Sequence, residues 1–559
     1  MNHVPNRRDF LRSTTLGAGI LVLSPWVRAQ TPESLLRTPA PDPDRLIAVA
    51  RQALDAARSA GASDVDVRIL TGARMRWDPV PDATASVNEA ERNHLVGQPV
   101  LQHGARIGLR VWVDGHMGFA GNMLSFNADQ TAALAKLAVQ RAKAWKVAGQ
   151  AASHLAAAPV VENGQWQTPI QIDPFTVPIG EQEGTLLEAM QAVRHTPTTA
   201  AISLSLYIEW KRIDELFASS TGSLLRQRLY SANHTGGFWA REKAGEWGFV
   251  SIQTGDLGGS RGYEGLKNLK QKLAAATQTA EEVRSLPWRP IEAGSYDVVL
   301  SPRAAAQLVA STIGYPLELD RALLRTSSFK EYATSYAVPP NEAIGRFEIG
   351  NELLNVRADR SRPGLAATVG WDAEGVKASE FALVQGGVLQ NYLSDRSTAA
   401  ALKPGYERLA QPVQSTGCAS DGGGLLPKIK LPNLALLPGS EAISQNDLIK
   451  DVKNGYLIDD LYPSADHTGL NVQARAQHAR HIRDGALGDV IQHATLQFNT
   501  PRFWQGLDAL GGAATVATHH HQLDERHLEK LSHVSITAPA MRVRKVNMVN
   551  TGRRGRRSD

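Results

Sequence analysis

A change of sequence pattern near residue 290 constrains the fold of this 559-residue chain more than any other feature. Before it, Ala-rich stretches with helical spacing alternate with strand-like runs, and after the segment 287–293 short strands and Gly- or Pro-bounded turns dominate. Such a change in the order of elements is typical of a domain boundary. We therefore predict an α+β protein. It has an N-terminal α/β domain over 30–290 and a mostly antiparallel β domain, barrel- or sandwich-like, over 291–550.

Local patterns predict the individual elements of both domains. Helical spacing of apolar residues predicts helices over 44–62, 127–148, 178–195, 266–282 and 302–313. Alternation predicts strands over 65–70, 99–121, 201–210, 249–253 and 296–300, with turns at Asp114-Gly115 and Gly121. The pair Gly386-Gly387 predicts a tight hairpin, and 425–438 and 496–503 are expected to be extended.

The first 29 residues have the pattern of a twin-arginine export signal. The pair Arg7-Arg8 is followed by a short, moderately apolar run over 16–27, and small residues precede a cleavage point after Ala29. The run is too short for a membrane span of ~20 residues. We expect a periplasmic protein that is not held in the membrane once the signal is removed.

The charge and the cysteine content limit the functions and the sites that this chain can have. The formal net charge is +5, but residues 1–29 and the tail 551–559 each carry four arginines against one aspartate, so the body is nearly neutral. This pattern does not predict nucleic-acid binding, and the tail is expected to be a disordered basic terminus. The single cysteine, Cys418, excludes an intramolecular disulfide and a zinc site made only of cysteines.

One stretch identifies a family resemblance. Residues 309–323 read VASTIGYPLELDRAL, which resembles the HExxxHPxELDRAL signature of the TldD/PmbA family of metallopeptidase-related proteins of the modulator-of-gyrase type. Further segments resemble the family in the same order from about residue 44 to 550: 259–264 (GSRGYE), 385–401, 416–419, 447–457 and 539–542. The resemblance implies the family's fold over nearly the whole chain.

The chemistry of the signature is altered in this chain. In active members both histidines bind zinc and the Glu is the general base on a metal-bound water. Here those positions are Ala310, Ser311 and Tyr315, none of which is a good zinc ligand or a base at neutral pH. Five residues on a regular helix turn through about 140°, so both histidine positions can face one metal only where the helix is irregular.

The family's third ligand is also missing, because Cys418 lies in a different segment and the family's CGK cysteine segment falls at about 518–521. Zinc is therefore not expected as a cofactor unless its ligands have been substituted. The weak candidates are His519, His520 and His521, in a His-rich region that also holds His478, His481, His527 and His533. A relocated zinc or copper site and an exposed loop that binds metal incidentally both stay open, with the loop favoured.

Two further motifs have competing interpretations. Gly258–Gly262 fits the G-x-S-x-G pattern, with Ser260 as a serine-hydrolase nucleophile, but it also matches the family's structural loop, which we favour. The cluster Glu318, Asp320 and Arg321 is either a remaining polar site or, as we favour, an ion-pair cluster that holds the fold.

The resemblance implies two functions. The first is a non-catalytic subunit that pairs with a TldD/PmbA-type partner, or with itself, and admits unfolded peptide to a peptide-degrading or peptide-processing complex. The alternative is an active metallopeptidase with substituted metal ligands. Peptide cleavage by the isolated chain, blocked by a chelator, would distinguish the second from the first.

Overall fold

The computed structural model describes residues 42–79, 95–149, 152–194, 202–241, 249–253, 257–325, 334–420, 425–523 and 532–552. The predicted export signal, most of the basic tail and His527 lie outside these residues. Within the described part of the chain, no helix is long and apolar enough to cross a membrane.

The N-terminal part is built on one large sheet with strand order β3-β2-β1-β5-β6-β4, and β7 pairs with β6. Its pairings are antiparallel except that β4 runs parallel to β6. The strands are β1 (Asp64–Pro79), β2 (Leu95–Val113), β3 (His116–Met123), β4 (Gly164–Gln167), β5 (Ile202–Ser219), β6 (Leu224–Arg241) and β7 (Phe249–Gln253). The helices are α4 (Pro43–Ser59), α5 (Ala128–Val147), α6 (Ile179–Arg194) and α7 (Leu269–Ser285).

Local chemistry explains where these elements begin and turn. Asn127 caps α5 by accepting from the Asp129 backbone N–H at 2.8 Å. Asp114 and Gly115 both have positive φ and form the predicted turn between β2 and β3. The turn predicted at Gly121 is wrong, because Gly121 lies inside β3 opposite Gly108. There a Cβ would approach the Leu425 side chain to 2.9 Å, so this glycine serves close packing.

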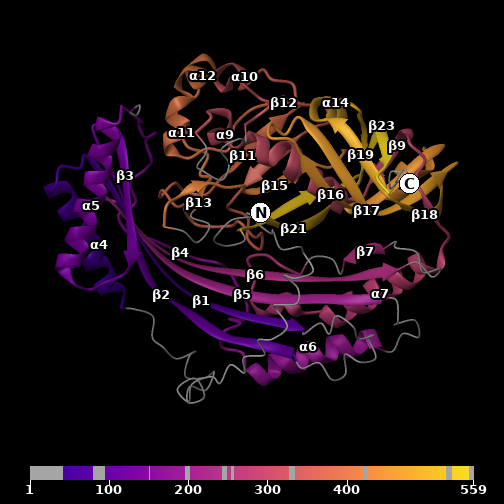
Figure 1. The fold of residues 1–559 in the computed structure, drawn as a ribbon, viewed down its shortest axis with the longest axis horizontal. Helices are drawn as coiled ribbons and strands as arrows, with labels where there is room; N and C mark the ends of the chain where they lie inside the picture. Colours follow the sequence, from indigo (N-terminus) through magenta and orange to yellow (C-terminus); the bar gives the residue numbers. More distant parts are fainter. Residues whose placement is uncertain are drawn as a thin grey trace, which may run out of the picture.

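Two separate helix pairs cover one face of the large sheet, and the C-terminal part lies over the other face (Figure 1). Helices α4 and α5 pack on one end of the sheet through a core that includes Val67 and Leu216. Helices α6 and α7 pack on the other end through a core that includes Trp210 and Leu273. The stretch of sheet between the two helix pairs is where a pocket forms, as described below.

The C-terminal part contains a six-stranded sheet and a closed barrel. The sheet order is β12-β11-β10-β15-β22-β21, and the ring β16-β9-β23-β19-β17 closes through a β16–β17 pairing. Pairing is antiparallel except for β16–β9, β15–β22 and β18–β8. The expected α+β class with a mostly antiparallel, barrel-like C-terminal part is confirmed. The sheet strands are β10 (Val356–Asp359), β11 (Glu380–Gln385), β12 (Val388–Leu389), β15 (Asn433–Leu436), β21 (Ala517–Leu523) and β22 (Ser532–Ala538).

Three further strands extend the sheet of the barrel outside the ring. The ring consists of β9 (Gly294–Leu300), β16 (Asn454–Ala465), β17 (Asn471–Arg483), β19 (Ala494–Asn499) and β23 (Met541–Asn550), with β8 (Trp288–Pro290), β18 (Ala486–Gln492) and β20 (Leu507–Leu510) paired outside it. The expectation that 496–503 is extended is wrong beyond Asn499. Helix α14 (Thr500–Gln505) begins there, because Pro501 suits the first turn of a helix, where no N–H partner is required.

Buried ion pairs join the large sheet to the C-terminal part. The Arg110 guanidinium of β2 contacts Asp66 of β1 and Glu374, which follows the six-stranded sheet's β10 in the chain, each at 2.5 Å. All three side chains are buried. Gln227 of β6 donates to the Trp371 carbonyl at 3.0 Å, which adds a second link. Buried polar links therefore join the two parts.

Candidate functional site

The segment with the family signature is a helix that changes its winding. Helix α8 (Pro302–Val309) begins at Ser301, whose hydroxyl accepts from the Ala304 N–H. It continues as a π-helical turn, η4 (Ala310–Gly314), and a 3-10 turn, η5 (Tyr315–Leu317). The Tyr315 N–H donates to the Ala310 carbonyl, five residues back, which sets these two positions one above the other. The irregular helix that the spacing of the signature requires is therefore present.

The side chains at the signature positions do not fit a zinc ion. Ala310 is fully buried in the C-terminal core and carries no donor atom. The Ser311 hydroxyl donates to the Gln307 carbonyl at 2.9 Å, within its own helix. The half-buried Tyr315 ring lies 5.6 Å from the Arg321 guanidinium carbon. The irregular turn thus carries an alanine, a locally bonded serine and a tyrosine beside Arg321, none of which is a usual zinc ligand or general base at neutral pH.

Neighbouring side chains hold the π-helical turn in place. The Tyr336 hydroxyl donates to the Thr312 carbonyl at 2.8 Å, and the Trp504 indole N–H donates to the Thr312 hydroxyl at 3.0 Å. Both aromatic residues are buried. A π-helical turn displaces backbone carbonyls from regular pairing, and Tyr336 supplies one of the missing donors.

The Glu318–Arg321 cluster follows the turn and is tied to the core. Glu318 is buried and its carboxylate accepts from the Arg321 Nε at 2.7 Å. The next residue, Leu319, donates its N–H to the Leu393 carbonyl at 2.9 Å. A buried pair with backbone links on either side holds the α9 segment (Leu319–Ala322) against the strand-like run at 391–394.

The His-rich region is spread over separate strands, and His520 lies near His533 of β22 and His234 of β6. His519, His520 and His521 lie on β21, where successive side chains point to opposite faces. His520 is partly buried and its Nδ1 lies 2.7 Å from the Ser535 hydroxyl. Burial lowers the pKa of His520 to about 3, with smaller contributions from His533 and His234, so the ring is neutral.

His478 and His481 are on the strand β17 and not on a helix, so their side chains face opposite ways, as expected for a strand. His478 lies 3.4 Å from Asp459, and His481 lies 2.8 Å from the Asn454 side chain. In the part of the chain that the structure describes, no three His, Cys, Asp or Glu side chains are grouped to hold a metal ion. The side chain of His521 lies outside the described residues.

Ser260 and Cys418 are both buried side chains. The Ser260 hydroxyl donates to the Ala366 carbonyl at 3.4 Å, and the segment after it is a 3-10 turn, η3 (Tyr263–Leu266), rather than the helix of a nucleophile elbow. Burial raises the pKa of the Cys418 thiol to about 12, so it stays protonated. Neither side chain has the exposure or the activation of a nucleophile.

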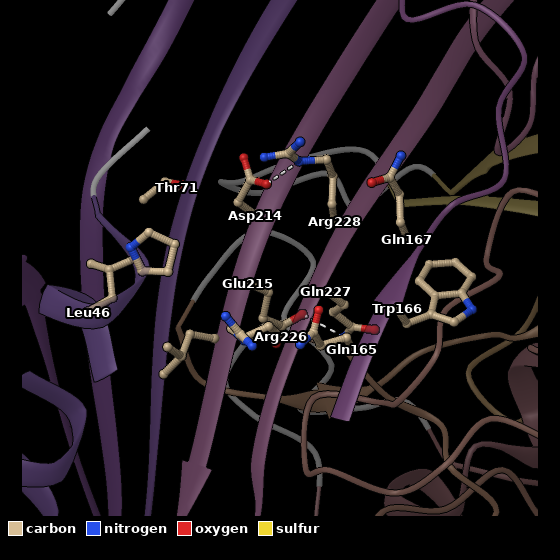
Figure 2. Close-up of a pocket in the computed structure, with 12 residues that line it drawn as sticks. Leu46, Thr71, Gln165, Trp166, Gln167, Asp214, Glu215, Arg226, Gln227 and Arg228 are labelled. Atoms are coloured by element: carbon tan, nitrogen blue, oxygen red, sulfur yellow. Dashed lines mark hydrogen bonds and ion pairs between the residues drawn. The ribbon is translucent and has the colours of Figure 1, made fainter. Parts of the chain in front are cut away.

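A pocket of about 400 Å³ opens on the large sheet between the two helix pairs (Figure 2). Leu46 of α4 borders one side and the edge strand β4 borders the other, over strands β5 and β6. Arg228 pairs with Asp214 at 2.5 Å within it. These residues have no local signal in the sequence, because the alternating pairs Gln165/Gln167 and Arg226/Arg228 form a common surface only through the register of β4 on β6.

Comparisons with known proteins agree with this fold. Residues 293–550 match the family model of the PmbA/TldA metallopeptidase C-terminal domain. A metalloprotease of Methanothermobacter thermautotrophicus is 24% identical over 60% of this chain and 68% of its own length. Metalloprotease MJ0996 of Methanocaldococcus jannaschii is 25% identical over 43% of this chain, and the match spans about half of that relative, 48%.

Solved structures resemble almost the whole chain. A modulator of DNA gyrase from Thermotoga maritima superposes with a TM-score of 0.66 at 14% identity, over 90% of this chain and 100% of that one. TldE from Thermococcus kodakarensis superposes with a TM-score of 0.63 at 14% identity, again over 90% and 100%. At these identities the likeness establishes the fold.

Proposed function

The chain belongs to the TldD/PmbA family of metallopeptidase-related proteins, and we propose that it acts in the periplasm as a non-catalytic partner subunit of a peptide-degrading or peptide-processing assembly. Its relatives are metalloprotease-like, so the substrate class that we propose is unfolded peptide.

One observation carries this proposal. The turn that places the two histidines and the glutamate in the family signature is present, but Ala310, Ser311 and Tyr315 occupy it. Ala310 is packed in the core and the Ser311 hydroxyl is bonded within its own helix. A chain that keeps the backbone of a catalytic turn without its ligands or base is suited to a structural or binding role beside a catalytic subunit.

The partner that we propose is a TldD/PmbA-type subunit with an intact HExxxH motif, with a homodimer as the other arrangement. Peptide could be admitted as an added strand, since β12 and β21 form the two ends of the six-stranded sheet. The export signal at residues 1–29 supports a periplasmic location for this assembly.

Co-expression tests the proposal directly. The mature chain is produced alone and together with an intact-motif homologue from the same genome, and each preparation is assayed on unfolded peptides with and without a chelator. We expect a stable complex, with chelator-sensitive cleavage that disappears when the partner's motif Glu is changed to Gln. Chelator-sensitive cleavage by the isolated chain would instead establish the alternative, an active peptidase with substituted ligands.

Metal content gives a second and independent check. Protein purified without an affinity tag is examined by mass spectrometry for zinc and copper. We expect less than one metal per chain, unaffected by changing His519, His520 and His521 to Ala. A stoichiometric metal that is lost in that variant would place a relocated centre on β21.

The location is tested by changing Arg7 and Arg8 to Lys. The pair is the recognition element of the export signal, so the variant is expected to remain uncleaved in the cytoplasm. Cell fractionation followed by N-terminal sequencing measures this. Equal export of the variant would argue against the twin-arginine route.

A further inference from the structure

We propose that the pocket on the large sheet binds a small carboxylate with an adjoining amide and an apolar group, the chemistry of an N-acylated amino acid or of a peptide's C-terminal residue. The pocket lies on the sheet face away from the C-terminal part. Along β5 and β6, the residues Asp214, Leu216 and Arg226 alternate with Glu215 and Gln227. Because Gln227 contacts Trp371 of the C-terminal part, Asp214, Leu216 and Arg226 lie on the opposite face of the sheet. The site is thus separate from the altered signature turn, and it does not depend on the proposed function.

The pocket holds one positive charge that no described carboxylate offsets. Arg228 is paired with Asp214 at 2.5 Å, whereas Arg226 makes a single hydrogen bond, at 3.3 Å, to the Asn163 side-chain oxygen. No acidic side chain among the described residues lies within ion-pair distance of Arg226. A guanidinium in this condition favours a planar carboxylate, which can accept two hydrogen bonds from it.

Two glutamine side chains beside Arg226 offer amide groups to a ligand. In the parallel β4–β6 pairing Gln165 lies opposite Arg226 and Gln167 opposite Arg228, so both glutamines share the pocket face. Neither side-chain amide bonds to a described residue. A glutamine amide both donates and accepts, so it matches the N–H and C=O of an amide next to a carboxylate.

The opposite wall is apolar. Pro43 and Leu46 at the start of α4 and Leu216 of β5 line the pocket. Figure 2 shows Leu46 across the pocket from Gln165 and Gln167. A pocket of about 400 Å³ is within the usual size for small-molecule sites, which combine apolar walls with a few convergent polar groups. A branched aliphatic side chain on the ligand would bury its surface against this wall.

A single unpaired arginine also favours a carboxylate over a phosphate group as the ligand's anion. Phosphate sites in proteins gather several backbone N–H groups or several cations around one group. Here the second arginine, Arg228, is already paired with Asp214, which also lies 3.5 Å from Arg212, and Arg226 is left as the one cation in the pocket lining without a described acidic partner. One carboxylate therefore suits this site better than a dianion.

The experiment is a calorimetric titration of the full mature chain with N-acetyl-leucine, and with N-acetyl-leucinamide, which lacks the carboxylate. We expect saturable binding of the acid and at least about tenfold weaker binding of the amide, since a charged hydrogen bond is lost. Arg226→Gln is expected to weaken binding of the acid by a similar factor. The control Arg357→Gln, at an exposed arginine on β10, should leave it unchanged.

Leu46→Asp tests the apolar wall independently and keeps the proposal testable if Arg226→Gln does not fold. It is expected to abolish measurable binding, because it places a negative charge beside the ligand's side chain. Equal affinity for the acid and the amide would overturn the proposal. So would the absence of saturation at about 10 mM, or unchanged binding in both pocket variants.

Discussion

The signature turn and the ion-pair network between the large sheet and the C-terminal part are both buried, yet they differ in their chemistry. At residues 310–315 the backbone is irregular, and its side chains are apolar or locally bonded. At the interface the side chains are charged, with Arg110 held between Asp66 and Glu374. The first region is distinguished by its backbone and the second by its buried charges.

The contrast teaches that burial and perturbed charge do not identify a functional site in this protein. The buried carboxylates Asp66, Glu374 and Asp372 accept hydrogen bonds from an arginine or from backbone N–H groups, and these bonds hold the surrounding segments together. The turn that resembles a catalytic centre is stabilised by ordinary packing and by Tyr336 and Trp504. The predictions below test whether this division of roles is correct.

The largest effect is expected from Arg110→Met. The change leaves Asp66 and Glu374 buried without their cation, and breaking such a buried pair costs about 3–5 kcal/mol of unfolding free energy. Urea denaturation followed by tryptophan fluorescence measures it. The matched control is Arg357→Met, at an exposed pair with Glu380, where the loss should stay below about 1 kcal/mol. Equal losses in the two variants would remove the special role of the interface network.

A smaller loss is expected from Ala310→His, which restores the family's residue. Ala310 is fully buried in the core, so an imidazole there overfills the space and costs about 1–3 kcal/mol. Ala275→His, on an exposed position of α7, is the control and should change stability by less than about 1 kcal/mol. If Ala310→His were as stable as the native chain, the turn would still contain the room of a ligand position.

The two regions differ in how well they can be predicted from the sequence, and the reason is physical. The irregular turn can be predicted from the sequence, because its signature is contiguous and the five-residue spacing requires an irregular helix. The ion-pair network cannot be predicted in this way. Asp66, Arg110 and Glu374 are far apart in the chain and meet only through strand register and domain packing. Local elements such as α4, β7 and the Gly386-Gly387 turn follow from short patterns and were predicted closely.

The sequence predicts a barrel- or sandwich-like part, but the strand order that closes the barrel and the position of the pocket do not follow from it, for the same reason. Barrel closure depends on the parallel β16–β9 pairing, which joins strands more than 150 residues apart and has no local signal. The pocket depends on Gln165 lying opposite Arg226, which requires the register of β4 on β6. The predicted extended run at 496–503 is wrong after Asn499, because Pro501 lies in the first turn of α14 and does not bound a strand.

A pH test separates the interface from the surface. Burial, and then the neighbouring Glu374 charge, raise the pKa of Asp372 to about 7. Since its pKa in the unfolded chain is near 3.8, the folded state binds the extra proton between about pH 4 and 7, and the free energy of unfolding falls as pH rises through that window. Asp372→Asn should flatten this slope, measured by urea denaturation at pH 5 and 7.5.

The control residue is Asp447, whose pKa shift has the opposite sign to that of Asp372. At the exposed start of helix α13 (Gln445–Lys450), hydrogen bonds from Ser444 and Lys450 lower the pKa of Asp447 to about 2. Its contribution to stability is present above about pH 4 and is lost as pH falls toward 2. Asp447→Asn should therefore leave the slope between pH 5 and 7.5 unchanged. A slope that survives in Asp372→Asn would assign the effect to other buried carboxylates, such as Asp395.

The smallest effect is expected from Ser311→Ala, at the position of the family's general base. The hydroxyl donates to the Gln307 carbonyl, which the Ala310 N–H also reaches, so no buried group loses its only partner. Alanine favours the helix slightly more, so stability should change by less than about 0.5 kcal/mol. Cleavage by a complex with an intact partner should also be unchanged. Removal of a general base costs about 10²–10⁴ in rate, so a loss of that size in Ser311→Ala, with stability intact, would show that the turn has kept chemistry as well as geometry.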